Sequence, residues 1–503
     1  ALRNYFHSMP HKNFSKVFIK VSDRKISKIL KSWLEKNYVV IEDEELFYDK
    51  SLKEFYDLLP EIIKSLVFLV QHKWRNFFFN EPVINGKIFE GSYSFFSYLL
   101  LFKFDELRGF ESKYWAGLDK LLPNKKNWIH IYTKSKEVQS TQSARKLVNS
   151  IKDSNSHIIF ESFQTRKVIL KAIKNYIKFY FSFNFPSFDS INKKIKTEIN
   201  FSSLFERHWN DSIYGKNALN NLILIESIKS LVEQLPDQKA GFYLLENQSW
   251  EKILNYFWHT NTKGPLFGVQ HNAVCFWDLR HTNFAEGSNK DRLIHPTKIL
   301  LNGQSAFESY INSGWQEDQL EKVEALRYLY LEPMIRTSLN NSNFKTDTET
   351  KILFLGDYSD DVNLALIEFC KKLMRHLGVN FEITFKSHPA SNVDFKSLIY
   401  RDIKITNESL DRVARKFDLI ITSNPTTASV ELLSMGARVF VHIDGKFLNL
   451  SPLKGYNINF ISENNIDEIF SANFEPISFE NFFYTDKKLK KWKALLYPLI
   501  NSE

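Results

Sequence analysis

The chain has 503 residues and a formal net charge of +9, and hydrophobic and aromatic residues make up 43% and 15% of it. This length favours two or more domains, and this composition supplies apolar side chains for cores and excludes a disordered chain. Only two cysteines occur, which gives no disulfide framework and fits a reducing compartment. The positive charge fits either simple solubility or attraction to an anionic surface or substrate.

The first part of the chain is irregular, with short apolar runs at 38–41 and 128–132 among basic helical patterns. Residues 1–20 contain no apolar segment typical of a signal peptide. The longest apolar stretches, around 62–70 and 93–102, are shorter than the roughly 18–20 residues that span a bilayer. We therefore expect a cytoplasmic protein.

Residues 167–183 are rich in Lys, Ile, Phe and Tyr and predict an amphipathic helix. This helix either covers a core with a solvated lysine face or contacts an anionic membrane surface, such as the inner face of the cytoplasmic membrane. No zinc-ligand spacing or basic DNA-reading helix occurs, so we expect no nucleic-acid partner.

From about residue 240 the pattern becomes regular. The sequence predicts buried strands at 241–245, 265–270 and 297–301, with helices at 249–259 and 305–313. Strand–helix–strand succession indicates parallel βαβ units. The polar segment 337–350 lacks apolar periodicity and is the best candidate for an interdomain linker.

The alternation is clearest after the linker. Strands are predicted at 351–355, 381–386, 403–406, 418–422, 438–443 and 457–461, and helices at 361–377, 409–416 and 427–435. The predicted fold class is therefore α/β, with two Rossmann-like domains that face a central cleft. The predicted division is 1–336 for the acceptor-side domain with helical insertions, 337–350 for the linker, and 351–503 for the nucleotide-sugar-binding domain.

Polar residues follow three predicted strands of the second domain and suggest a nucleotide site at one crevice. The predicted helix after the third strand offers N–H groups and a partial positive charge to a phosphate. Thr427 and Glu431 lie on one face of that helix, where Glu431 can accept hydrogen bonds from ribose hydroxyls. An ordinary N-cap cluster is the alternative interpretation. The predicted nucleotide-binding residues are Gly356, Asp357, Tyr358, Ser359, His388, Pro389, Ser423, Thr426, Thr427 and Glu431.

A second group of polar residues follows the predicted strands of the first domain. A transferase needs a base or a nucleophile, and a cation for an acidic sugar. The catalytic candidates are Glu246, Asp278 and His271, and the substrate-binding candidates are Arg280, Asn247 and Gln270. No metal-ligand cluster, Walker A motif or dinucleotide-binding glycine motif occurs, so we expect no metal and no cofactor.

Three segments resemble a bacterial family of surface carbohydrate biosynthesis proteins over about residues 240–452. They are the motifs Glu246-Asn247-Gln248-x-Trp250-Glu251, Gln270-His271 followed by Phe276-Trp277-Asp278-Leu279-Arg280, and Glu324-Ala325-Leu326-Arg327-Tyr328. The second domain is also similar to sialyltransferases and Kdo transferases of the GT-B type, which share a His-Pro motif and a Ser/Thr motif on the phosphate of CMP. Here these motifs are His388-Pro389 and residues 423–429.

This resemblance implies a GT-B enzyme that uses a CMP-activated nonulosonic acid (sialic, pseudaminic or legionaminic) or Kdo to build a lipopolysaccharide O-antigen or capsule. The acidic motif of some sialyltransferases is absent, which leaves the catalytic carboxylate and the choice between inversion and retention open. Two alternatives remain at this point. One is a polyol-phosphate transferase of the teichoic-acid type, and the other is a non-catalytic nucleotide-sugar-binding subunit of a polysaccharide assembly complex.

Overall fold

The computed structural model describes residues 16–19, 24–35, 39–42, 59–76, 81–105, 109–122, 125–135, 137–183, 193, 200–261, 263–275, 277–283, 291–335, 350–377, 381–388, 391, 393, 403–444, 448–469 and 479–501. The chain forms two compact units. Unit 1 comprises residues 1–81 and 162–230, and unit 2 comprises residues 82–161 and 231–503.

Unit 1 is mainly helical. A small core of Ala172, Tyr176, Ala218, Leu219 and Ile223 joins its helices. Its helices are α2 (Arg24–Leu34), α4 (Glu61–Asn76), α7 (Arg166–Ser182), α9 (Ser202–Ile213) and α10 (Lys216–Gln234, which continues into unit 2), and its strands are β1 (Lys16–Ile19) and β2 (Val39–Glu42), which pair in parallel. The helix predicted at 167–183 is therefore present as α7, which Thr165 caps through a hydrogen bond from the Val168 N–H.

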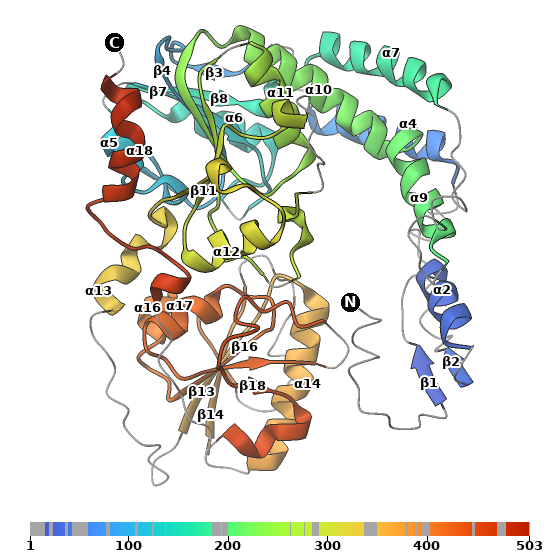
Figure 1. Cartoon of the computed structure of the whole chain (residues 1–503), viewed down its shortest axis with the longest axis vertical. Coiled ribbons are helices and arrows are strands. Elements are labelled where there is room, and N and C mark those ends of the chain that lie inside the picture. The colour runs from blue at the N-terminus through green and yellow to red at the C-terminus, as the bar shows by residue number, and fades with distance from the viewer. Residues whose placement is uncertain are drawn as a thin grey trace. The chain divides into compact units, whose positions relative to one another are not determined.

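The first sheet of unit 2 has eight strands in the order β12-β11-β10-β9-β4-β7-β8-β3. Figure 1 labels β3, β4, β7, β8 and β11 of this sheet. All neighbouring strands are parallel except the edge strand β3. The strands are β3 (Ile84–Asn85), β4 (Ser92–Tyr98), β7 (Lys126–Ile131), β8 (Ser156–Ile159), β9 (Gln238–Leu244), β10 (Leu266–Val269), β11 (Lys298–Leu301) and β12 (Leu320–Lys322). The strand order reverses between β4 and β9, so this is the topological switch point of a Rossmann-like sheet.

A row of aromatic side chains crosses the middle of this sheet. Phe95 stacks on Trp128 and on Phe242, with ring centroids 4.7 and 5.2 Å apart, and Phe242 stacks on Phe267 at 5.4 Å. These residues are directly paired across four neighbouring strands. Cross-strand aromatic pairs add packing energy and fix the register of the strands.

Short helices and a β-hairpin connect the strands of this sheet or follow them in the chain. These elements are β5 (Phe102–Asp105), β6 (Gly109–Ser112), α5 (Leu118–Leu121), α6 (Thr141–Ser150), α11 (Ser249–Thr260), α12 (Gln304–Asn312), the 3-10 helix η7 (Leu326–Leu331) and α13 (Glu332–Ile335). The observed α11 and α12 agree with the helices predicted at 249–259 and 305–313, and β9 to β11 agree with the three predicted strands.

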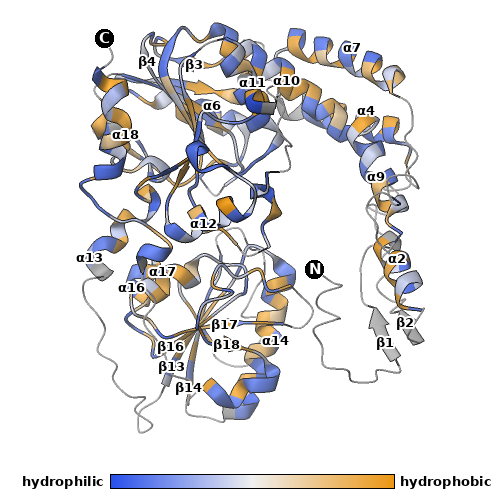
Figure 2. Cartoon of the chain, in the orientation of Figure 1, coloured by the Kyte–Doolittle hydropathy of each residue, from blue (hydrophilic) through white to orange (hydrophobic). Residues whose placement is uncertain are grey.

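The second sheet has six parallel strands in the order β15-β14-β13-β16-β17-β18. Its elements are β13 (Thr350–Leu355), α14 (Asp360–Leu377), β14 (Phe381–Lys386), β15 (Lys404–Ile405), α16 (Leu410–Val413), β16 (Leu419–Thr422), α17 (Ala428–Ser434), β17 (Val439–His442) and β18 (Phe460–Ile461). Its switch point lies between β13 and β16. The central strands β16 and β17 are buried throughout and β13 is buried except at Lys351, as expected for a parallel sheet covered on both faces. Figure 2 shows the hydrophobic residues of this region concentrated in the sheet and on the inner sides of its helices.

The chain returns to the first sheet after completing the second. The Tyr484 N–H donates to the Asn302 carbonyl at 2.8 Å, and the Ala325 N–H donates to the Tyr484 carbonyl at 2.7 Å. A Cβ added at Gly303 would lie 1.8 Å from the Phe482 carbonyl oxygen, so only glycine lets the returning chain pass this closely.

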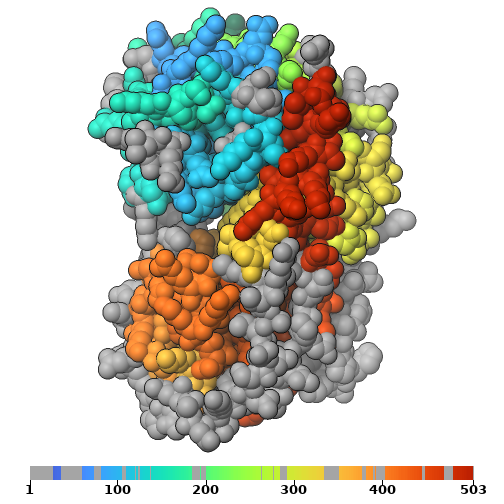
Figure 3. Space-filling view, turned by 90° about the vertical axis from the view of Figure 1, so that its left-hand side faces the viewer, coloured from blue at the N-terminus to red at the C-terminus, as the bar shows by residue number. Residues whose placement is uncertain are grey.

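The C-terminal helix α18 (Lys490–Asn501) then packs on the first sheet, where Figure 3 shows it in red. The Glu324 carboxylate accepts hydrogen bonds from the Lys491 and Trp492 N–H groups at 2.8 and 3.0 Å. The Trp492 side chain is fully buried, and its ring lies 6.2 Å from that of Phe242. A residue of the predicted segment 324–328 thus has a structural role, capping α18.

The predicted fold class, α/β with two Rossmann-like domains in the GT-B manner, is confirmed by the two parallel sheets. Most of the predicted linker 337–350 lies outside the described residues, so the division at that segment stays a prediction. The segment 482–501 belongs with the first sheet by its contacts, although it follows the second in sequence. None of the helices in the described ranges is long and apolar enough to cross a membrane.

Candidate functional site

The loop after β9 is held in place by a buried carboxyl group. Glu251, in the first turn of α11 and 1% exposed, accepts hydrogen bonds from the N–H groups of Glu246 and Asn247 at 2.9 to 3.2 Å. Asn247 adopts a positive φ of 55° there, which Asn tolerates better than most residues. Burial raises the pKa of Glu251 to about 8. These hydrogen bonds therefore fix the loop, and the Glu246 side chain lies at the carboxyl end of strand β9.

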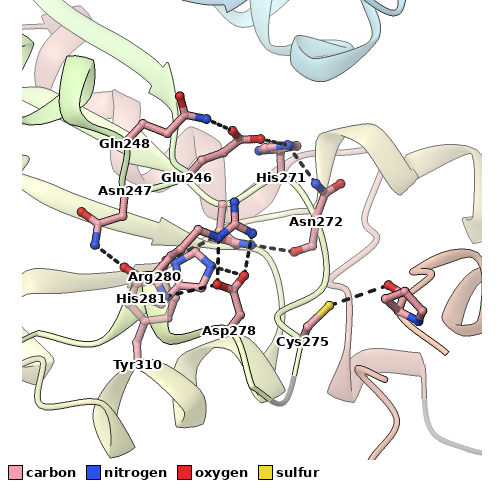
Figure 4. Close-up of polar contacts among 12 residues, drawn as sticks. Glu246, Asn247, Gln248, His271, Asn272, Cys275, Asp278, Arg280, His281 and Tyr310 are labelled. Atoms are coloured by element: carbon pink, nitrogen blue, oxygen red, sulfur yellow. Dashed lines mark hydrogen bonds and ion pairs between the residues drawn. The ribbon is translucent and has the colours of Figure 1, made fainter. Parts of the chain in front are cut away.

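Glu246 lies at the switch point of the first sheet. Tyr98, the last residue of β4, donates to Glu246 Oε2 at 3.2 Å, and the Gln248 amide also donates to this oxygen. Figure 4 shows Glu246 pointing toward His271, whose Nε2 is 3.6 Å from Oε1. The carboxylate is partly exposed, with 24% of its side chain accessible. It is therefore oriented by neighbours and open to a substrate.

His271 follows β10 and is 7% exposed. Its ring meets Tyr114 edge-on at 5.3 Å, and its Nε2 lies 3.0 Å from the Asn272 amide nitrogen. Burial, aided by the charges of Arg327 and Arg280, lowers the pKa of His271 to about 3. The imidazole is therefore neutral at physiological pH.

The orientation of Asn272 defines the tautomer of His271. The Asn272 Oδ1 accepts hydrogen bonds from the Arg327 guanidinium and from the Tyr328 hydroxyl, so its amide nitrogen is directed at the imidazole. Because this nitrogen donates to Nε2, the proton of the neutral ring lies on Nδ1. Nδ1 is buried and has no hydrogen-bond partner among the described residues.

Asp278 forms ion pairs and hydrogen bonds with Arg280 and His281. It accepts from Arg280 Nε at 2.8 Å and NH2 at 2.6 Å, and it lies 3.3 Å from His281 Nε2. Although burial acts in the opposite direction, hydrogen bonds from His281 and Arg280 hold the pKa of Asp278 well below its usual range. An ionised carboxylate that already neutralises a guanidinium is a weak proton acceptor.

The cluster continues into the interior of the first sheet domain. His281 Nδ1 lies 2.6 Å from the Tyr310 hydroxyl, which donates to Gln270 Oε1 at 3.2 Å. The Asn247 side chain bonds the Arg280 carbonyl. Two of the predicted substrate-binding side chains differ in exposure. Gln270 is buried and orients its neighbours, whereas the Arg280 side chain is 57% exposed.

At the switch point of the second sheet, Asp357 and Ser423 meet. Ser423 Oγ lies 3.5 Å from Asp357 Oδ2, and Oδ1 accepts from the Ser359 N–H at 3.0 Å. Asp357 is 3% exposed and Ser423 is fully buried, and burial raises the pKa of Asp357. Gly356 is buried as well, and its N–H donates to the Lys386 carbonyl.

Three other predicted residues of this sheet are accessible. Tyr358 is 67% exposed, and its ring lies 6.3 Å from that of His388, which is also exposed. Burial of the imidazole, together with the charges of Arg327 and Lys386, lowers the pKa of His388. Ser359 is partly exposed. Pro389 lies outside the described residues.

The helix α17 begins one residue later than predicted and has seven residues. Thr426 Oγ1 accepts from the Ala428 N–H at 3.3 Å, so this hydroxyl caps the helix locally. Thr427 hydrogen-bonds to the Tyr328 phenol. Glu431 is 7% exposed and accepts a hydrogen bond from the Tyr330 hydroxyl, which comes from η7 beside the first sheet.

Several contacts join the two groups of strand-end residues. Cys275 Sγ, after β10, lies 3.9 Å from the Pro425 carbonyl, after β16. Arg327 lowers the pKa of both His271 and His388, so its charge reaches both sheets. The carboxyl ends of the two sheets therefore lie against one another, and their polar residues form one region.

The residues of this region that the sequence analysis does not predict include Tyr98, Tyr114, Asn272, Arg327 and Lys386. Tyr98 lies within the apolar stretch 93–102, which the sequence analysis considers only for its length. Arg327 lies within the quoted segment 324–328 but was given no role. Among the described residues, no group of three or more His, Cys, Asp or Glu side chains is arranged to hold a metal ion.

No protein-family model matches the sequence, and a search of curated proteins gives no match. Several solved structures resemble the chain weakly in their backbone fold. MnaA of S. aureus, solved with UDP, has a TM-score of 0.42 and 11% identity and covers 82% of this chain and 98% of its own. UDP-GlcNAc 2-epimerase from Neisseria meningitidis, bound to UDP-GlcNAc, has a TM-score of 0.40 and 10% identity, with coverages of 82% and 100%.

A further structure, α,α-trehalose 6-phosphate synthase from Burkholderia multivorans, has a TM-score of 0.41 and 9% identity, with coverages of 82% and 99%. At these scores and identities no activity transfers to this chain. The fold assignment accordingly depends on the strand order and register of the two sheets.

Proposed function

We propose that the chain is a glycosyltransferase that moves a sugar from a nucleotide donor to a glycan acceptor. One observation carries this proposal: both switch points hold polar residues, with Glu246 at one and Asp357 at the other, and the two sheet ends lie against each other. Ligands of open parallel sheets bind at such points. Two of them side by side accommodate a nucleotide at the second sheet and an acceptor at the first.

The donor in this proposal is a CMP-activated acidic keto-sugar with eight or nine carbons, namely Kdo or a sialic, pseudaminic or legionaminic acid. This part depends on the resemblance around His388 and residues 423–429. The acceptor is a surface glycan, such as a lipopolysaccharide O-antigen or a capsule. The exposed Tyr358 and His388 and the cations near them favour a ligand with a phosphate and a flat base at the second sheet.

In this proposal Glu246 is the catalytic carboxylate. It accepts the proton of the acceptor hydroxyl, whose oxygen forms the new bond to the anomeric carbon while the bond to the CMP phosphate breaks. The electron pair of the broken bond leaves with CMP. If the reaction retains configuration, Glu246 instead attacks the anomeric carbon first. The neutral His271 lies beside it, 3.6 Å from Glu246 Oε1, and its lowered pKa makes it a poor proton acceptor.

A panel of nucleotides tests the nucleotide site. CMP is expected to stabilise the protein by about 2.7 kcal/mol at 100 times its Kd, whereas UDP and GDP do little. Release of CMP from a panel of CMP-sugars then tests transfer. Binding without turnover would indicate the non-catalytic subunit, and turnover with only a polyol-phosphate donor would indicate the teichoic-acid type.

We also expect transfer to continue in EDTA. A CMP-sugar carries one phosphate, which hydrogen-bond donors and cations of the protein can stabilise during departure. Complete loss of turnover in EDTA, restored by magnesium, would instead indicate a diphosphate donor and would contradict this part of the proposal.

We further propose that helix α7 contacts an anionic membrane surface at which the acceptor is made. Its outward side exposes Leu170, Ile177 and Phe181, at 65%, 52% and 82%. The helix contains Arg166 and four lysines and no acidic residue, and Figure 2 shows hydrophobic and hydrophilic residues along it. Exposed apolar side chains flanked by basic ones are typical of helices that lie in a membrane interface.

A further inference from the structure

Arg327 is a cation of the site that forms no ion pair with a carboxylate among the described residues. Its guanidinium donates to Asn272 Oδ1, and it lies 5.9 Å from the centre of the Tyr114 ring and 5.5 Å from that of Tyr328. The residue is only partly exposed. None of the ion pairs formed within the described ranges includes Arg327, although the charge is withdrawn from bulk water.

Arg280 has the opposite surroundings. It forms a bidentate ion pair with Asp278, and more than half of its side chain is exposed. Its charge is already neutralised, so binding a second carboxylate or a phosphate there would require breaking that pair. This difference argues against the predicted role of Arg280 as the cation for the acidic sugar.

Glu431 is the acidic residue whose charge acts on the pKa of Arg327. Although burial disfavours the charged guanidinium, Tyr328 and Glu431 act together to raise the pKa of Arg327. Glu431 itself is buried and bonded to Tyr330, and burial raises its pKa. Glu431 therefore compensates the guanidinium less than a direct ion pair does.

Lys386 adds a second cation in the same region. It ends β14, it is partly buried, and burial lowers its pKa. Both Lys386 and Arg327 lie near enough to His388 to lower the pKa of that imidazole. Among the described residues neither Lys386 nor Arg327 forms an ion pair with a carboxylate, and the charges of both act on the exposed His388, where Asp357 opposes them.

A partly buried guanidinium with one neutral hydrogen-bond partner retains free donors and an uncompensated charge. Its planar fork matches the two oxygens of a carboxylate or a phosphate. The nearby rings of Tyr114 and Tyr328 and the bond to Asn272 hold the guanidinium in position before a ligand arrives.

We propose that Arg327, supported by Lys386, binds the anionic group of the substrate at the junction of the two sheets. This proposal depends on the proposed nucleotide-sugar site, because it names which group binds the donor's oxyanion. The oxyanion is either the donor's phosphate or the sugar's carboxylate, which present the same chemistry to a guanidinium. The experiment separates the two sources.

The probes are inorganic phosphate, CMP and free N-acetylneuraminic acid, whose affinities are measured by calorimetry at constant ionic strength. Arg327→Gln is expected to weaken binding of at least one probe about tenfold or more, whereas Arg327→Lys retains part of it. Loss confined to phosphate and CMP identifies the phosphate as the ligand, and loss confined to the sugar acid identifies the carboxylate. The charge-matched control is Arg292→Gln, at an exposed residue of the first domain.

Unchanged affinities in a folded Arg327→Gln would overturn the proposal, and so would binding of none of the probes by the natural chain. An effect of Arg280→Gln as large as that of Arg327→Gln would also overturn it. The proposed function is tested separately. If inorganic phosphate binds through Arg327 and CMP does not bind at all, the CMP donor is wrong and the anion site stands.

Discussion

The strand ends of the two sheets differ in how their polar side chains are partnered. In the first domain Asp278, Arg280 and His281 bond to one another, and Glu251 holds the loop that carries Glu246. In the second domain Tyr358 and His388 are exposed. The first region is therefore set in position by its own contacts, which agrees with the proposed catalytic role, whereas the exposed second region agrees with the proposed nucleotide site.

The largest effect is expected from Glu246→Gln. Removing a positioned base lowers the rate of transfer about 10²–10⁴-fold, because the acceptor hydroxyl loses its proton acceptor. Affinity for CMP, measured by calorimetry, is expected to stay the same, since the proposed nucleotide site is at the other sheet. Glu317→Gln, at an exposed residue, is the control. Full activity of Glu246→Gln would remove this residue from the reaction.

Asp278→Asn tests whether the first region depends on its internal contacts. An amide cannot neutralise Arg280, so we expect a loss of about 1.5–3 kcal/mol in the free energy of unfolding, seen as a lower urea midpoint. Transfer should fall as well, because His281 and the loop of Asn247 lose their support. Asp318→Asn changes an exposed carboxylate and should leave the midpoint unchanged. An unaltered midpoint for Asp278→Asn would mean that the cluster contributes nothing to stability.

At the second sheet, His388→Ala and Thr427→Ala should weaken CMP binding more than tenfold, or by about 1.5–3 kcal/mol, with the fold intact. His376→Ala is the control, because His376 pairs with Asp467 at the far end of α14. If both folded variants bind CMP as tightly as the natural chain does, the proposed nucleotide site at the second sheet is wrong.

The smallest effect concerns α7. Replacing the exposed Lys174 and Lys178 by Gln should weaken co-sedimentation with anionic liposomes at low salt, by about 1 kcal/mol for each lysine. The same change at the exposed Lys351 and Lys493 removes equal charge elsewhere and should have less effect. If the natural chain does not co-sediment, the lysines of α7 are only a solvated surface.

The second sheet was predicted closely from the sequence, and β14 spans exactly the predicted residues 381–386. Its central strands β13, β16 and β17 contain short apolar runs that amphipathic helices separate, which is the pattern that a parallel sheet produces. In contrast, β4 and β7 have the sequences SYSFFSY and KNWIHI. Their polar side chains are buried because they bond one another, as Ser94 and Asn127 both do with Gln238.

The candidate site was predicted in outline only. Polar residues after strands could be expected to meet, and Glu246 and His271 do, as do Asp357 and Ser423. The pairing of Asp278 with Arg280 depends on a turn that no periodicity indicates. The position of Arg327 depends on the 3-10 helix η7 and on Asn272, 55 residues earlier in the chain. Such long-range contacts leave no local pattern in a sequence.

The return of the chain to the first sheet determines when that domain can be completed during synthesis. Trp492 fills the face beside Phe242, and the segment at Gly303 accepts Phe482 only after the second sheet has been made. On the ribosome, the domain begun first is thus the one finished last. A premature stop before residue 490 would consequently damage the N-terminal domain, leaving its aromatic face exposed to chaperones and to aggregation.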